Sequence, residues 1–169
     1  KFMSSEKLID VGSERAILAG LLQHGIDGYV AVSDIISEDS FGNVNNKVIF
    51  RCIEHVVLND QTVDIPSILS AAEQLKLSET INTKQELTYI NSLSDFPVNK
   101  DNIFKFALQA KKFEFARKIK SITGKIYKEI DDVNGTETVN EIIQILENPV
   151  TDFLREDDGG ENPERIGEG

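Results

Sequence analysis

The stretch that decides the fold is residues 100–132, which read KDNIFKFALQAKKFEFARKIKSITGKIYKEIDD. Apolar residues recur there at close to 3.6-residue spacing, so the stretch is predicted to form one long α-helix. The apolar residues make two stripes on different faces. One stripe is Phe104, Leu108, Phe115, Ile119, Ile122, Ile126 and Ile130, and the other is Ile103, Phe106, Ala110 and Phe113. One stripe docks a helix on its own domain, so two stripes predict a subunit contact on one side.

The chain as a whole has the composition of a globular protein. At 169 residues with 40% hydrophobic content, it is long enough to bury a core, as one domain or one domain with an appendage. No apolar run approaches the roughly 18 residues that span a bilayer, and no signal peptide is evident. We therefore expect no membrane association and a cytoplasmic location. Cys52, the single cysteine, lies on an apolar helix face and is predicted to be a buried structural thiol.

Capping signals place shorter helices on both sides of the long one. Ser13 is predicted to cap a first helix that Gly25 ends, and a second helix is expected over roughly 26–36. Asp64 and the capping box at 83–86 should begin two more helices. Another helix is expected over about 48–58, and Phe41 is expected to plug into the core. No stretch reads as a strand, so the predicted fold class is all-α, a multi-helix globule followed by a long helical hairpin.

The hairpin is predicted from the residues that follow the long helix. Asn134-Gly135 should turn the chain, and a second capping box at 138–141 should start a return helix that Asn148-Pro149 ends. This gives four predicted parts: an N-terminal extension (1–12), a helical globule (13–98), a hairpin that pairs subunits (99–149) and an acidic linker (150–169).

No constellation of residues indicates catalysis. His24 and His55 are isolated, and neither has a second ligand at metal-binding spacing. Gly124-Lys125 resembles the end of a phosphate-binding loop, but the preceding glycine is missing and the pair sits within a predicted helix. We therefore predict no catalytic, cofactor-binding or metal-binding residue in this chain.

Charge leaves a second reading open. The net charge is −11, yet residues 100–128 hold nine of the eighteen basic residues against Asp101 and Glu114. Such a basic strip could touch phosphates, could pair with acidic surface in an oligomer, or could simply be solvated. Its candidate residues are Lys105, Lys111, Lys112, Arg117, Lys118 and Lys120. An α-helical nucleic-acid-binding or regulatory protein is therefore the alternative function, although no helix-turn-helix signature is evident.

Several short motifs occur in the order of a known family. Residues 13–22 resemble the opening "E-x-x-V-L-G-x-L-L" helix of the N-terminal domain of DnaB-like replicative helicases. Similar matches follow at Phe41 with 48–50, at 63–69 ("V-D-x-x-T-L"), at 89–93 ("Y-L-x-x-L") and at 102–119. The resemblance covers roughly residues 13–148. Asn46 replaces the family's usual histidine, and the glycine pair before "Y-L" is absent, which indicates a divergent branch, such as one from a bacteriophage.

The resemblance implies a role in DNA replication. In this family, a helical globule is followed by a hairpin that pairs between subunits, and the paired domains form a collar of a hexameric ring around single-stranded DNA. Primase docks on the collar, and helicase loaders can act there. ATP and Mg are expected only in a RecA-like ATPase domain of the parent helicase, which is missing here. If the protein comes from a bacteriophage, the expected location is the cytoplasm of the host cell. The subunit-interface candidates are Phe106, Phe113, Ile119, Ile122 and Ile126.

Overall fold

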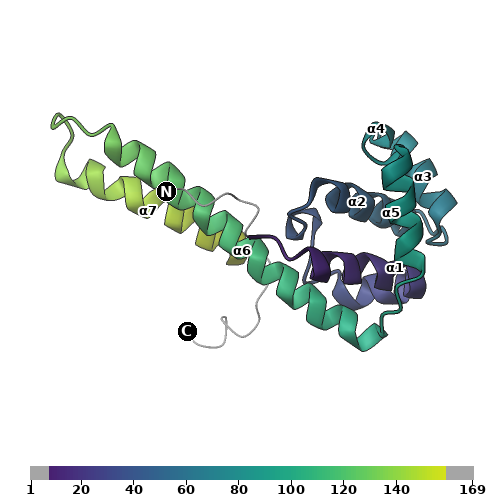
Figure 1. Ribbon diagram of the computed structural model, residues 1–169. Helices are drawn as coiled ribbons and strands as arrows, with labels where there is room; N and C mark the ends of the chain where they lie inside the picture. The colour runs from purple at the N-terminus through teal and green to yellow at the C-terminus, as the bar shows by residue number, and fades with distance from the viewer. Residues whose placement is uncertain (1–7, 159–169) are drawn as a thin grey trace. The chain divides into compact units, whose positions relative to one another are not determined.

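The computed structural model describes residues 8–158, which form helices joined by short loops (Figure 1). Within that range there is no strand, so the predicted all-α fold class is confirmed. No helix among these residues is long and apolar enough to cross a membrane.

The chain divides into two compact units. The first extends to Arg117 and the second begins at Lys118, so the long helix α6 (Lys100–Asp131) contributes to both. In the first unit α6 is preceded by five α-helices and one turn of 3-10 helix. These elements are α1 (Val11–Val32), η2 (Glu38–Ser40), α2 (Val44–Leu58), α3 (Ile65–Gln74), α4 (Ser78–Ile81) and α5 (Lys84–Ser94).

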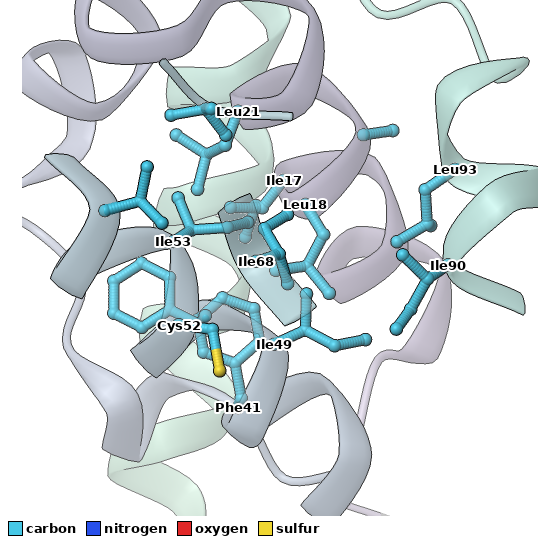
Figure 2. Packing of buried hydrophobic residues seen from close by; sticks show 14 of the residues in the cluster. Ile17, Leu18, Leu21, Phe41, Ile49, Cys52, Ile53, Ile68, Ile90 and Leu93 are labelled. Atoms are coloured by element: carbon cyan, nitrogen blue, oxygen red, sulfur yellow. The ribbon is translucent and has the colours of Figure 1, made fainter. Parts of the chain in front are cut away.

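The core of the first unit is built mainly from α1 and α2. Figure 2 shows Ile17, Leu18 and Leu21 of α1 packed with Ile49 and Ile53 of α2. The predicted insertion of Phe41 is confirmed, because its ring stacks on Phe50 at a centroid distance of 4.8 Å. Cys52 is also buried, as predicted. Burial of these side chains is the main force that holds the helices together.

Helix α1 begins earlier than predicted and is broken in the middle. Its cap is Asp10, whose carboxylate accepts from the Ser13 N–H at 3.0 Å, so Ser13 lies inside the helix and is not the cap. At Gly25 the backbone has φ 56° and ψ −133°, a conformation that only glycine adopts readily. The predicted break at Gly25 is therefore present, and the second segment continues to Val32.

The second unit contains the hairpin of α6 and α7 (Val139–Asp158), which lie side by side and antiparallel (Figure 1). The predicted capping box is confirmed, since Thr138 Oγ1 accepts from the Glu141 N–H and Glu141 accepts from the Thr138 N–H. The predicted end of the return helix at Pro149 is wrong, because α7 passes through this proline. Residues 150–158, predicted as linker, are helical, and residues 159–169 of that linker lie outside the described range.

The division of the chain into four parts remains a prediction. The two compact units of the structure meet between Arg117 and Lys118, whereas the predicted globule ends at residue 98. The first part of α6 belongs to the globular unit, where Ile103, Ala107 and Ala110 are buried in the core. In the predicted N-terminal extension, residues 11 and 12 already belong to α1.

Candidate functional site: an apolar face on the helical hairpin

Helix α7 carries two rows of apolar side chains along its length. The first row is half-buried and comprises Ile142, Ile145, Pro149 and Phe153. The second row stands at steps of three or four residues and is exposed by between 39% and 73%. Its members are Val139, Ile143, Leu146, Val150 and Leu154. A helix that packs on a single neighbour needs one apolar stripe, so the second row is unaccounted for within the hairpin.

Helix α6 has a matching set of apolar side chains in the same unit. Ile119 is 52% exposed, and Tyr127 and Ile130 are exposed as well. Ile122 and Ile126 are half-buried, and Ile122 lines a groove together with Phe153 of α7. The isoleucines of α6 thus extend from the contact with α7 out to the solvent.

One side of the hairpin carries polar side chains from both helices, beside the half-buried Ile122 and Phe153. Two shallow grooves of about 240 and 330 Å³ lie between the helices, and both are lined by Lys125, Pro149 and Asp152. Gln144 and Asn148 also line the smaller of the two grooves. Because polar residues of both helices line the same grooves, they mark one side of the hairpin. At 100° per residue, the exposed apolar rows of α6 and α7 then lie together on the other side.

We call this surface the hairpin face. It consists of Ile119 and Ile130 of α6 with Val139, Ile143, Leu146, Val150 and Leu154 of α7. Large contiguous apolar surfaces on a soluble domain usually mark sites of protein interaction. The chemistry that such a surface offers is burial of apolar area, with no nucleophile or general base among its residues.

The predicted interface residues are divided between the two units. Ile119, Ile122 and Ile126 belong to the hairpin, and Ile119 lies on the hairpin face itself. Phe106 packs instead against the core of the first unit, and Phe113 is half-buried there. The structure therefore brings three of the five candidates together and places two elsewhere.

The predicted basic residues do not all present free charge. Lys105 and Lys112 are exposed. Lys111 forms an ion pair with the buried Glu114 at 2.8 Å. Arg117 donates to the carbonyl oxygens of Leu8 at 2.9 Å and Asp39 at 2.8 Å.

Two further residues of the basic strip, Lys118 and Lys120, are half-buried and belong to the second unit. Spacing on a helix also turns the side chains of Lys105, Lys111 and Arg117 in widely different directions. The six residues therefore do not form one continuous strip.

The sequence predicts an apolar face of the return helix at Val139, Ile142, Ile143 and Leu146, which includes three residues of the exposed row. The signal of the whole row is the spacing of residues 139, 143, 146, 150 and 154, which is close to the helical period. The predicted end of the helix at Pro149 excludes Val150 and Leu154, which continue the row in the structure.

A buried polar cluster in the first unit ties the loop before α2 to its neighbours. Glu14 is 1% exposed and accepts from the N–H groups of Gly42 and Asn43 and from the Asn46 amide at 2.9 Å. Burial raises the pKa of Glu14, and these hydrogen bonds offset part of that effect. Asn46 also accepts from the Tyr89 hydroxyl at 2.7 Å. The cluster is satisfied internally, which indicates a structural role.

No group of three or more metal-ligating side chains occurs within residues 8–158. The comparisons with known proteins address the family directly. The sequence family described as DnaB-like helicase N terminal domain matches residues 6–112, which is more than half of the chain. The chain belongs to this family. No curated protein gives a significant sequence match.

The fold agrees with the family assignment. This DnaB-like domain is similar to the crystal structure of the N-terminal domain of DnaB helicase from Mycobacterium tuberculosis, with a TM-score of 0.72. The match covers 85% of this chain and 97% of that chain at 14% identity, so it shows the shared fold alone. The family match confirms the predicted family resemblance.

Proposed function

We propose that this domain is an assembly module of a replicative DNA helicase that pairs with a second copy through the hairpin face and has no catalysis of its own. The observation that carries the proposal is the exposed apolar row on α7 beside the exposed isoleucines of α6. Pairing two identical faces about a two-fold axis covers both at once, which is the commonest arrangement of homodimers.

The apolar area is large enough to support such pairing. Seven large apolar side chains on each copy are about half exposed. Burying the rest of each side chain contributes on the order of 1 kcal/mol, so the two copies together gain roughly 14 kcal/mol. Association of two proteins costs about 4–15 kcal/mol in lost freedom. The balance favours pairing whose strength depends on concentration, as suits a module that assembles a ring.

Protection of a thiol tests the pairing directly. Cys52 is buried, so a cysteine introduced on the surface should be labelled selectively. We expect the labelling rate of Ile143→Cys, on the hairpin face, to fall as protein concentration rises. The matched control is Gln144→Cys on the polar side, whose rate should stay constant. Equal rates for Ile143→Cys at all concentrations up to high micromolar would refute pairing through this face.

The paired domains are proposed to form the collar of a hexameric ring around single-stranded DNA and to dock primase or a helicase loader. The family membership supports this role, and ATP with Mg is assigned to a separate ATPase domain of the helicase. Co-sedimentation of this chain with the primase of the same genome tests the docking. A complex that survives when the hairpin face is mutated would place the primase elsewhere on the domain.

A nucleic-acid-binding role for the basic residues of α6 is less well supported. Lys111 and Arg117 are engaged in contacts within the chain, so fewer charges remain for phosphates. A salt titration of single-stranded DNA binding distinguishes the two functions. A steep loss of affinity with salt would favour DNA binding, because each neutralised phosphate releases counterions.

A further inference from the structure

The first unit has a groove that is separate from the hairpin face. It consists of two adjoining hollows of about 460 and 350 Å³, which share Leu22, Gln23 and Val63 as lining residues. The groove lies where the break of α1 at Gly25 meets the loop between α2 and α3. Both hollows belong to the unit that ends at Arg117, so they do not depend on the hairpin.

The lining of this groove is mixed, with an aliphatic part beside the polar residues Gln23, His24, Gln61, Thr62 and Ser94. The aliphatic side chains come from Leu22 of α1, Val57 of α2, Val63 of the loop before α3 and Ile65 of α3. Ile26 stands at the edge of the groove and is 55% exposed. Such a surface can accept one or two aliphatic side chains of a partner.

The charged residues around the groove are acidic. Asp60 and Asp64 line it, and no lysine or arginine lines either hollow. Asp64 caps α3 by accepting from the Ser67 N–H at 2.8 Å, so the helix terminus offsets part of its charge. Asp60 makes no such contact with a helix terminus and is exposed. A cation on a partner would therefore be attracted mainly toward Asp60.

The loop beside the groove also offers unused backbone groups. Residues 61–63 belong to no helix, and Gln61 donates its N–H to the Val56 carbonyl at 3.0 Å. In the part of the chain that the structure describes, the N–H groups of Thr62 and Val63 donate to no protein acceptor. Thr62 is exposed, so its N–H can donate to a carbonyl oxygen of a bound peptide.

We propose that this groove binds an extended peptide segment of a partner protein in which a lysine or arginine stands next to large aliphatic residues. The aliphatic side chains would enter between Leu22 and Val63, and the cation would lie near Asp60. A carbonyl oxygen of the peptide would accept from the Thr62 N–H. Complementary charge and an apolar floor together select this chemistry over an acidic or wholly polar segment.

Selection from a displayed library of random peptides tests the proposal on the full chain. We expect the selected peptides to combine lysine or arginine with leucine, isoleucine or valine. Asp60→Asn should weaken a synthesised winner by about three-fold, because an exposed ion pair contributes little. Asparagine also tolerates the positive φ of 55° at this position, so the backbone is preserved. Ile26→Lys should weaken binding ten-fold or more by placing a like charge at the edge.

Matched surface variants serve as controls. Val30→Lys adds the same charge one helical turn away, and Asp34→Asn removes a charge outside the groove, so neither should change the affinity. Amide chemical shifts should move at residues 22–26 and 61–63. The proposal is overturned if no peptide is enriched, if acidic peptides are enriched, or if Ile26→Lys and Val30→Lys bind the winner equally well. None of these outcomes affects pairing through the hairpin face, which lies in the other unit.

Discussion

The sharpest test of the hairpin face is the substitution Leu146→Lys. Leu146 lies in the middle of the exposed row of α7 and is 55% exposed in the single chain. Lysine has a helix propensity close to that of leucine, so the helix itself should form as before. If the face is solvated in the working protein, a lysine there is harmless. If a second copy covers it, the lysine places a charge in an apolar contact.

The expected effect follows from the area that remains to be buried. Full burial of a leucine side chain contributes about 2 kcal/mol, so covering the exposed half contributes about 1 kcal/mol. A two-fold pair contains the substitution twice, which doubles the loss. Keeping two ammonium groups hydrated at the edge of the contact adds a further penalty of about 1–2 kcal/mol, moderated because lysine can extend toward solvent. The total of about 3–4 kcal/mol corresponds to a loss of affinity of roughly 100- to 1000-fold.

Sedimentation equilibrium over a range of concentrations measures this loss as a change in the dissociation constant. The matched control is Gln144→Lys, which places the same charge on the polar side of the same helix. Thermal unfolding followed by circular dichroism should show similar midpoints for the two variants at a concentration where both are monomeric. Equal association of the two variants, or a wild-type chain that stays monomeric at high micromolar concentration, would refute the reasoning.

Three further predictions concern stability and reactivity. The pKa of Glu14 is raised by burial, so its contribution to stability is present below its ordinary pKa of 4.5 and is lost as the pH rises through the folded-state value. The unfolding midpoint of Glu14→Gln should therefore increase relative to that of the wild type as the pH rises. A difference between the two midpoints that stays constant with pH would contradict this. Urea unfolding should show that Gly25→Ala destabilises the chain by about 1–3 kcal/mol because of its positive φ, whereas Gly124→Ala should stabilise it by up to about 1 kcal/mol. An added Cβ has open space at both glycines, so a loss of stability for Gly124→Ala would be inconsistent with this reasoning. Burial raises the pKa of the Cys52 thiol to about 11, so a thiol reagent should not react at neutral pH until the chain is unfolded.

Local signals in the sequence predicted most of the helices because their physics is local. Asp64 and Thr138 begin helices as predicted, since each side chain satisfies an N–H that the helix leaves open. The predicted start of α1 at Ser13 is wrong because two nearby residues can each cap a helix. Asp10 and Ser13 are both good caps, and the Asp10 carboxylate accepts from the Ser13 N–H and from its hydroxyl at 2.8 Å.

The predicted end of the return helix at Pro149 is wrong because packing of α7 outweighs the effect of the proline. Proline removes one backbone hydrogen bond and usually ends or kinks a helix at a cost of about 3 kcal/mol. The half-buried row of α7 continues on both sides of it, from Ile145 to Phe153, and packing of that row offsets the loss. The apolar period of α7 continues past the proline, and this period is the sequence signal that indicates the last turns of the helix.

The assignment of each apolar stripe to a partner could not be predicted from the sequence. The pattern in residues 100–132 shows two stripes, but a stripe has the same spacing whether its own chain or another chain covers it. In the structure, the globule buries Ile103 and Ala110 of one stripe, and Phe106 and Phe113 of the same stripe are half-buried. Ile119 and Ile130 of the other stripe stay exposed even after α7 has packed beside them. Since α7 brings a further exposed row of its own, the return helix enlarges the uncovered apolar surface, which is the strongest reason to expect a second molecule on the hairpin face.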